Sequence, residues 1–169
     1  MAKNELEFIF PDTFRNQTSL EVLYLHVNKL IFISPDTFRY LTRLKELALQ
    51  DNRLRFISPG TFNQLTNLEE LAFSKNELTS ISGDTFKSLV NLKKLYLHTN
   101  KLDSLSAKAF IYLTHLKELY LQKNQLAEIH AATFDFKTVN YLSIDLRENL
   151  LTHKSQALCG SNDKCKIIF

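Results

Sequence analysis

The chain has 169 residues, a length that suits one domain. Lysine and arginine outnumber aspartate and glutamate by 21 to 18, and the net charge of +3 is too even to indicate a nucleic-acid partner or a polybasic membrane surface. A hydrophobic fraction of 44% excludes global disorder, two cysteines exclude a disulfide-dense scaffold, and no apolar run reaches the length of about 18 residues that a membrane span needs.

A spacing of 24 residues organises the chain, and repeats of this length are typical of solenoids. Asparagine recurs at this interval and once more after 25 residues: Asn4, Asn28, Asn52, Asn76, Asn100, Asn124 and Asn149. Phenylalanine forms a second column: Phe14, Phe38, Phe62, Phe86, Phe110 and Phe134. The prolines form a third column: Pro11, Pro35 and Pro59.

The first segment, residues 1–19, is a half repeat without a cysteine and without the strand that would precede Asn4. Two interpretations stay open: a fragment that lacks its signal peptide and first cap, or a half repeat that itself serves as a cap. Both predict an exposed apolar edge near Phe8 and Phe10 that favours self-association. Asn16, followed by Gln17 and Thr18, is an N-glycosylation site if the chain is secreted.

Residues 20–151 contain five full repeats and a degenerate sixth repeat of the pattern L-x-x-L-x-L-x-x-N-x-L. The L-x-L alternation predicts one short strand per repeat, with its leucines inward, and successive strands stack as a parallel sheet. The asparagine amide can satisfy backbone groups of neighbouring turns, and the phenylalanine rings should stack under the opposite, convex side. The proline column favours an irregular or 3₁₀ convex segment over a long helix.

On these columns, residues 4–151 resemble the leucine-rich repeat superfamily, in particular its "typical" 24-residue subclass of animal extracellular proteins. Variable lymphocyte receptors of jawless vertebrates, Toll-like receptor ectodomains and insect leucine-rich repeat immune proteins are similar. The resemblance implies an α/β repeat solenoid, a curved horseshoe with a parallel concave sheet and a mostly irregular or 3₁₀ convex side. It also implies an extracellular or cell-surface location, although Met1 does not begin a signal peptide.

The core explains the constant columns, so function is expected at the variable positions that point outward from the strands. We assign four outward columns. The first is Val22, Glu46, Glu70, Lys94, Glu118 and Ser143, and the second is Tyr24, Ala48, Ala72, Tyr96, Tyr120 and Asp145. The third is His26, Gln50, Ser74, His98, Gln122 and Arg147, and the fourth is Val27, Asp51, Lys75, Thr99, Lys123 and Glu148.

The second and third columns predict a ligand-binding surface. Tyr96 and Tyr120 should be adjacent, and rigid tyrosines beside small residues are typical of antibody-like binding sites. The candidate binding residues are Tyr24, His26, Lys94, Tyr96, His98, Glu118, Tyr120 and Gln122. The alternative is that these are ordinary exposed strand residues, since tyrosine has a good strand propensity. A basic partner could use Glu46 and Glu70, although such charges more often keep a surface soluble.

Nothing in the sequence indicates an enzyme or a cofactor. The nucleophile, zinc and phosphate-loop motifs are missing, and three glycines are too few for a glycine-rich loop. His26 and His98 lie three repeats apart and cannot share a metal ion, so no metal site is expected.

Residues 152–169 follow the last repeat as a divergent C-terminal cap or a tail. Caps of the family usually carry four cysteines, and this segment has Cys159 and Cys165 with five residues between them. The extracellular resemblance implies a disulfide that closes a small loop, and two free thiols in a tail are the alternative.

These observations predict a non-enzymatic recognition module that binds a protein or glycan ligand on the concave face, as part of an extracellular receptor or immune protein. The alternative is a structural scaffold that assembles through its exposed repeat edge and that could act inside cells. The extracellular location is implied by the resemblance alone. The outward columns specify the geometry of the concave face and do not identify the ligand.

Overall fold

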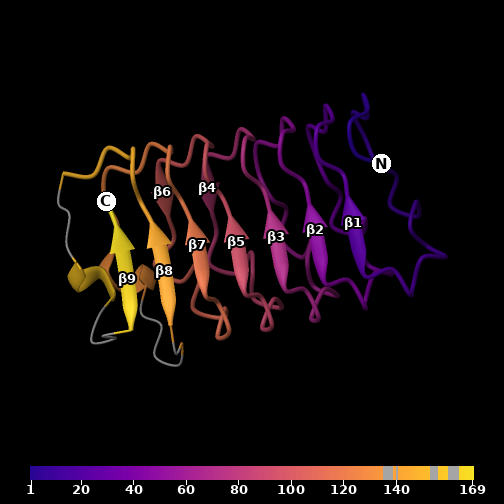
Figure 1. Ribbon diagram of the computed structural model, residues 1–169. Helices are drawn as coiled ribbons and strands as arrows, with labels where there is room; N and C mark the ends of the chain where they lie inside the picture. The colour runs from indigo at the N-terminus through magenta and orange to yellow at the C-terminus, as the bar shows by residue number, and fades with distance from the viewer. Residues whose placement is uncertain (135–138, 140, 153–155, 160–163) are drawn as a thin grey trace.

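The computed structural model describes residues 1–134, 139, 141–152, 156–159 and 164–169. Its main sheet is one row of parallel strands that follow one another in chain order along the molecule (Figure 1). The strands are β1 (Val22–Tyr24), β2 (Glu46–Ala48), β3 (Glu70–Ala72), β5 (Lys94–Tyr96), β7 (Glu118–Tyr120), β8 (Leu142–Asp145) and β9 (Cys165–Ile168).

The register of the sheet joins equivalent residues of successive repeats. Leu23 is opposite Leu47, and Leu47 is opposite Leu71 in the next strand. These leucines are buried, whereas the residues on either side of them in each strand point to the other face. The predicted repeat solenoid with a parallel sheet is therefore confirmed.

The phenylalanine column fills the core on the convex side. The rings of Phe62, Phe86 and Phe110 are stacked, with centroids 6.2 and 6.1 Å apart, and Phe134 continues the stack at 6.1 Å. These four side chains are at most 1% exposed. From Phe62 to Phe134 each repeat therefore contacts the next through one ring, as the column predicts, and Phe14 and Phe38 are stacked in the same way at 6.3 Å.

The asparagine column forms a ladder of hydrogen bonds inside the solenoid. The side-chain amide of Asn76 donates to the carbonyl oxygens of Leu49 and Phe73, both at 3.0 Å. Its side-chain oxygen accepts from the amide of Leu54, also at 3.0 Å. From Asn28 to Asn149 each asparagine thus joins its own turn to the preceding repeat, which satisfies backbone groups that the short strands leave unpaired.

The residue before each asparagine adopts a left-handed backbone, which the sequence pattern does not predict. The prediction that the fourth outward column lies on the strands is wrong, because these residues lie in a turn after them. Its φ values lie between 54° and 59°: Val27, Asp51, Lys75, Thr99, Lys123 and Glu148. Lys3 has the same conformation in the half repeat. The neighbouring repeats hold this turn, since Asp51 donates to the Ser74 carbonyl and its own carbonyl accepts from Asn28.

The convex side consists mainly of consecutive turns, as predicted. In the first repeats the amide of each turn bonds to a carbonyl three residues earlier, for example Leu41 to Phe38. Helix in the described part of the chain is limited to the 3₁₀ segments η1 (Ala131–Phe134) and η2 (Gln156–Cys159). A two-stranded sheet, β4 (Ser80–Ile81) with β6 (Ser104–Leu105), lies behind the main sheet in Figure 1 and was not predicted.

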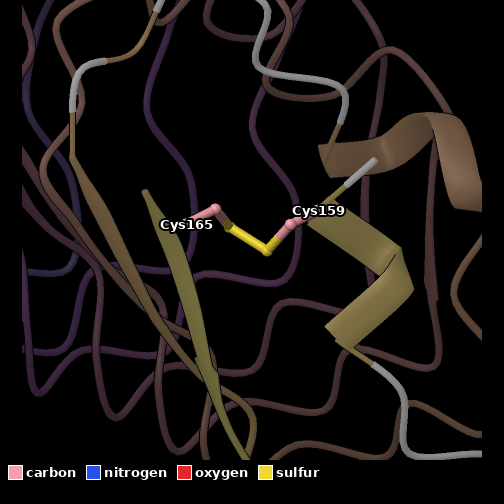
Figure 2. The surroundings of a disulfide bond; sticks show 2 residues. All are labelled: Cys159 and Cys165. Atoms are coloured by element: carbon pink, nitrogen blue, oxygen red, sulfur yellow. A yellow bond between two sulfur atoms is a disulfide. The ribbon is translucent and has the colours of Figure 1, made fainter. Parts of the chain in front are cut away.

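The two ends of the solenoid differ. At the N-terminal end Phe8 and Phe10 are 46% and 72% exposed, so the predicted apolar edge is present. At the other end, residues 152–169 add a strand that was not predicted, since β9 pairs in parallel with β8. Figure 2 shows the disulfide that joins Cys159, at the end of η2, to Cys165, at the start of β9. The described C-terminal residues therefore continue the sheet.

Candidate binding face

The first three outward columns share one side of the main sheet, which we call the concave face. The strand register places Tyr24, Ala48, Ala72, Tyr96, Tyr120 and Asp145 side by side. The third column lies just beyond the strands, since each strand ends with the second column. The face therefore presents one short row of side chains per repeat, and the rows differ from one another.

Tyr96 and Tyr120 form the main aromatic feature of the face. Their rings are stacked with centroids 4.9 Å apart and an angle of 4° between the planes, which confirms that they are neighbours. The Tyr120 hydroxyl donates to the carboxylate of Glu118. Both rings are half-buried, so each is held in place and still reaches the surface.

The hydroxyl groups of this pair are difficult to ionise. Burial, followed by the charge of Glu70, raises the pKa of Tyr96 to about 12. The hydrogen bond to Glu118, followed by burial, raises the pKa of Tyr120 to about 12. Both hydroxyls are therefore neutral hydrogen-bonding groups over the physiological pH range.

Tyr24 and His26 form a second, smaller aromatic pair, with ring centroids 5.6 Å apart. Hydrogen bonding to Glu46 raises the pKa of the Tyr24 hydroxyl. β2 and β3 separate this pair from Tyr96 and carry Ala48 and Ala72 at the equivalent position. The predicted binding residues therefore form two groups, one on β1 and one on β5 and β7.

At the C-terminal side of the face, Asp145 occupies the tyrosine position of β8 but is only 4% exposed, although it was placed in an outward column. Arg147 covers it, with nitrogen-to-oxygen distances of 2.6 to 3.2 Å. Desolvation raises the pKa of Asp145, but the hydrogen bonds and charge of Arg147 outweigh it and leave that pKa lowered. Desolvation, followed by the charge of Lys75, lowers the pKa of His98.

Several polar atoms of the third column are shut off from solvent and have no hydrogen-bond partner among the described residues. They are His26 Nδ1, Gln50 Oε1 and Gln122 Oε1. A buried polar atom without a partner costs free energy, and a water molecule or a ligand group can satisfy it. These atoms lie along the face and not in the asparagine ladder.

The charged residues of the first column are unevenly paired. Lys94 lies 3.6 Å from the Glu118 carboxylate. Glu46 and Glu70 lie directly opposite one another in β2 and β3, and neither has a cationic partner among the described residues. The sequence places both carboxylates in one outward column, but it does not predict which of the charges are paired.

The other predicted features lie outside the concave face. Asn16, Gln17 and Thr18 are exposed and precede β1 in the chain. No three histidine, cysteine, aspartate or glutamate side chains cluster as a metal site within the part of the chain that is described. No helix among the described residues is long and apolar enough to cross a membrane.

Comparisons with known proteins agree with this architecture. A family model described as "Leucine rich repeat" matches residues 1–54, 42–102 and 90–138. A search of curated protein sequences finds no match.

Three solved structures are similar in fold. A crystal structure of a TLR13–ssRNA13 complex has a TM-score of 0.84 and 24% identity, over 99% of this chain and 23% of that chain. The Toll–Spatzle complex, described as a molecular hub in Drosophila development and innate immunity, has a TM-score of 0.79 and 28% identity, over 86% and 21%. The leucine-rich repeat domain of APL1B has a TM-score of 0.76 and 23% identity, over 87% and 41%. The chain spans less than half the length of each of these structures.

Proposed function

Because the chain belongs to the leucine-rich repeat family, we propose that it is a non-enzymatic module that binds a protein partner on its concave face. Within this proposal residues 20–151 are the repeats, residues 1–19 are a half repeat, and residues 152–169 are a C-terminal cap. The partner contacts the rows of variable side chains, and no bond of the partner is made or broken.

The stacked pair of Tyr96 and Tyr120 is the observation that carries the proposal. Tyrosines that are fixed in place add contact area at a low cost in conformational entropy, and they are enriched among residues that dominate binding energies. Lys94, His98, Glu118 and Gln122 surround the pair with groups that can form hydrogen bonds.

A protein is favoured over a nucleic acid as the partner. TLR13 is complexed with ssRNA13 and Toll with Spatzle, so related solenoids are found with both classes. In this chain the first column presents the unpaired carboxylates of Glu46 and Glu70, which repel phosphate groups. A polypeptide has no such uniform negative charge, and its amide groups match the neutral tyrosine hydroxyls.

The proposal is tested by selecting peptides from a random library on the immobilised chain. We expect Tyr96→Ala combined with Tyr120→Ala to weaken most selected peptides by tenfold or more. Tyr112→Ala is the matched control, because Tyr112 is 39% exposed in a turn on the convex side. Peptides that bind both variants equally, or lose affinity only for Tyr112→Ala, would contradict a binding site at the tyrosine pair.

An extracellular or cell-surface receptor, or a secreted immune protein, is the setting that we propose for this module. The Cys159–Cys165 disulfide supports it, since disulfides persist in oxidising compartments. The exposed Asn16 sequon is compatible with it. Expression through a eukaryotic secretory pathway, followed by mass spectrometry, should find a glycan at Asn16; a secreted chain without that glycan would remove this support.

A second candidate function is assembly through the N-terminal edge, which the exposure of Phe8 and Phe10 favours. Light scattering over a concentration series, with and without reductant, measures it. A molar mass that grows with concentration, and stops growing in a variant with Phe8→Ser and Phe10→Ser, would support assembly. A monomer at every concentration would argue against it.

A further inference from the structure

Glu46 and Glu70 differ from every other carboxylate of comparable burial in the described part of the chain. Each of the others that is not exposed has a cationic nitrogen within 3.6 Å: Glu21, Glu69, Glu77, Glu118 and Asp145. Glu46 and Glu70 are also half-buried, yet no such nitrogen accompanies them. They face one another across β2 and β3, where like charges destabilise a sheet. On this part of the concave face, therefore, no lysine or arginine among the described residues forms an ion pair with either carboxylate.

The lysines nearest to these carboxylates are engaged with other partners. A shallow hollow of about 220 Å³ is lined by Val22, Lys45, Glu46, Glu69, Glu70, Lys93 and Lys94. Lys45 lies 2.8 Å from Glu21, and Lys93 lies 2.7 Å from Glu69. Lys94 is opposite Glu70 in the register of β3 and β5, but its ion pair is with Glu118, at 3.6 Å. The hollow thus offers space for a side chain beside two carboxylates that remain unneutralised.

Aromatic and polar groups border the same region. The hydroxyl of Tyr24 interacts with Glu46, and the ring is 43% exposed, so it offers a face to a neighbouring cation. Gln50 Oε1 and His26 Nδ1, in the third column of β2 and β1, have no hydrogen-bond partner among the described residues. An aromatic ring thus lies next to Glu46, and the two unpartnered polar atoms belong to the third column of the same repeats.

We propose that the face of β1 to β3 docks a cationic segment of the protein partner, which places a lysine or arginine side chain between Glu46 and Glu70. The inference rests on the proposed binding function and names the chemistry of the partner. An arginine fits best, because its planar guanidinium can bond to two carboxylates at once and can lie against the Tyr24 ring. The Tyr96–Tyr120 pair then contacts a second part of the same partner.

The test uses two labelled octapeptides, one alternating arginine with serine and one alternating glutamate with serine, and measures binding by fluorescence anisotropy at physiological salt. We expect the arginine peptide to bind the chain and the glutamate peptide not to bind. Glu46→Gln combined with Glu70→Gln should weaken the arginine peptide about tenfold, the loss of one charge-assisted hydrogen bond. The double variant should fold, because it removes a like-charge contact, and its melting temperature checks this.

Glu5→Gln combined with Glu77→Gln is the matched control, since it changes the net charge equally but removes carboxylates that pair with Lys29 and Lys101 outside the face. It should leave the affinity within twofold. Equal binding of the arginine peptide to both double variants, or no binding to the unaltered chain, overturns the inference. A calcium-dependent rise in melting temperature that needs Glu46 and Glu70 also overturns it, in favour of a metal ion.

The library selection separates the two proposals. Selected peptides that depend on Tyr96 and Tyr120 but show no enrichment in lysine or arginine would refute the cationic partner and leave the binding function standing. Peptides that map to the convex side would refute the binding function itself.

Discussion

The interior and the concave face of this solenoid are built from the same repeats but follow different rules. Inside, the same asparagine recurs from repeat to repeat and bonds to backbone groups of its own and the preceding repeat. The same phenylalanine recurs from Phe14 to Phe134, and its rings stack, for example Phe86 on Phe110. On the concave face the equivalent positions change from tyrosine to alanine to aspartate. Among the described residues, polar atoms of Gln50 and Gln122 there have no hydrogen-bond partner, and Glu46 and Glu70 have no cationic partner.

The difference separates stability from recognition. A residue whose hydrogen bonds and charge are satisfied within the chain gains little from a binding partner. A group without such a partner in the chain can gain free energy when a binding partner supplies one. Substitutions inside should therefore lower the free energy of unfolding, and substitutions on the face should alter binding more than stability.

The largest expected effect comes from the phenylalanine stack. Phe86→Ala should lower the free energy of unfolding by about 4 kcal/mol, because it leaves a cavity between Phe62 and Phe110. Phe56→Ala is the control, since Phe56 is 54% exposed and its loss should cost under about 1 kcal/mol. Chemical denaturation measures both. Equal losses would mean that the stack does not hold the repeats together.

The asparagine ladder should give the next largest effect. Asn76→Ala should cost about 2 kcal/mol, because the carbonyls of Leu49 and Phe73 and the amide of Leu54 lose their bonds. Asn91→Ala should cost much less, because Asn91 is exposed and the one bond of its side chain to a described residue is to the Thr66 carbonyl. If Asn76→Ala lowers the free energy of unfolding as little as Asn91→Ala does, water replaces the hydrogen bonds of the ladder. The interior then does not depend on the asparagine side chain for its hydrogen bonds.

The left-handed turn gives a smaller effect of opposite sign. Val27 has a φ of 55°, which is unfavourable for a β-branched residue, and asparagine tolerates this conformation. Val27→Asn should therefore raise the free energy of unfolding by about 1 kcal/mol. Val22→Asn, at an exposed valine in the extended strand β1, should not be stabilising. A rise for both variants would point to surface polarity as the cause.

The smallest effect concerns the tyrosine pair and alkaline pH. The pKa of Tyr96 and of Tyr120 is raised from 10.0 to about 12 in the folded chain. The protonated hydroxyls therefore stabilise the fold fully below pH 10, and this contribution is lost as the pH rises towards 12. Tyr96→Phe combined with Tyr120→Phe should flatten stability over this range in thermal melts. An unchanged pH profile would show that both hydroxyls are solvated.

Much of the fold follows from the sequence, because the repeated leucine, asparagine and phenylalanine columns fix the strands, the ladder and the stack. The neighbourhood of Tyr96 and Tyr120 follows from the same register. The left-handed turns were missed because Val27 and Thr99 are not residues that favour φ above zero, and bonds to neighbouring repeats impose the conformation. The strand β9 and the pairing of the charges depend on packing between segments, which no column in the sequence records.

The register of the sheet also sets a length scale for anything laid across it. Equivalent side chains of successive repeats lie one strand spacing apart, about 4.8 Å, so every second repeat returns after about 9.6 Å. A polyproline II segment completes one turn of three residues in about 9.3 Å. A partner in that conformation, lying across the strands, would present the same side to every second repeat. A sequence motif with a period of three residues would then place equivalent side chains opposite equivalent positions of the concave face.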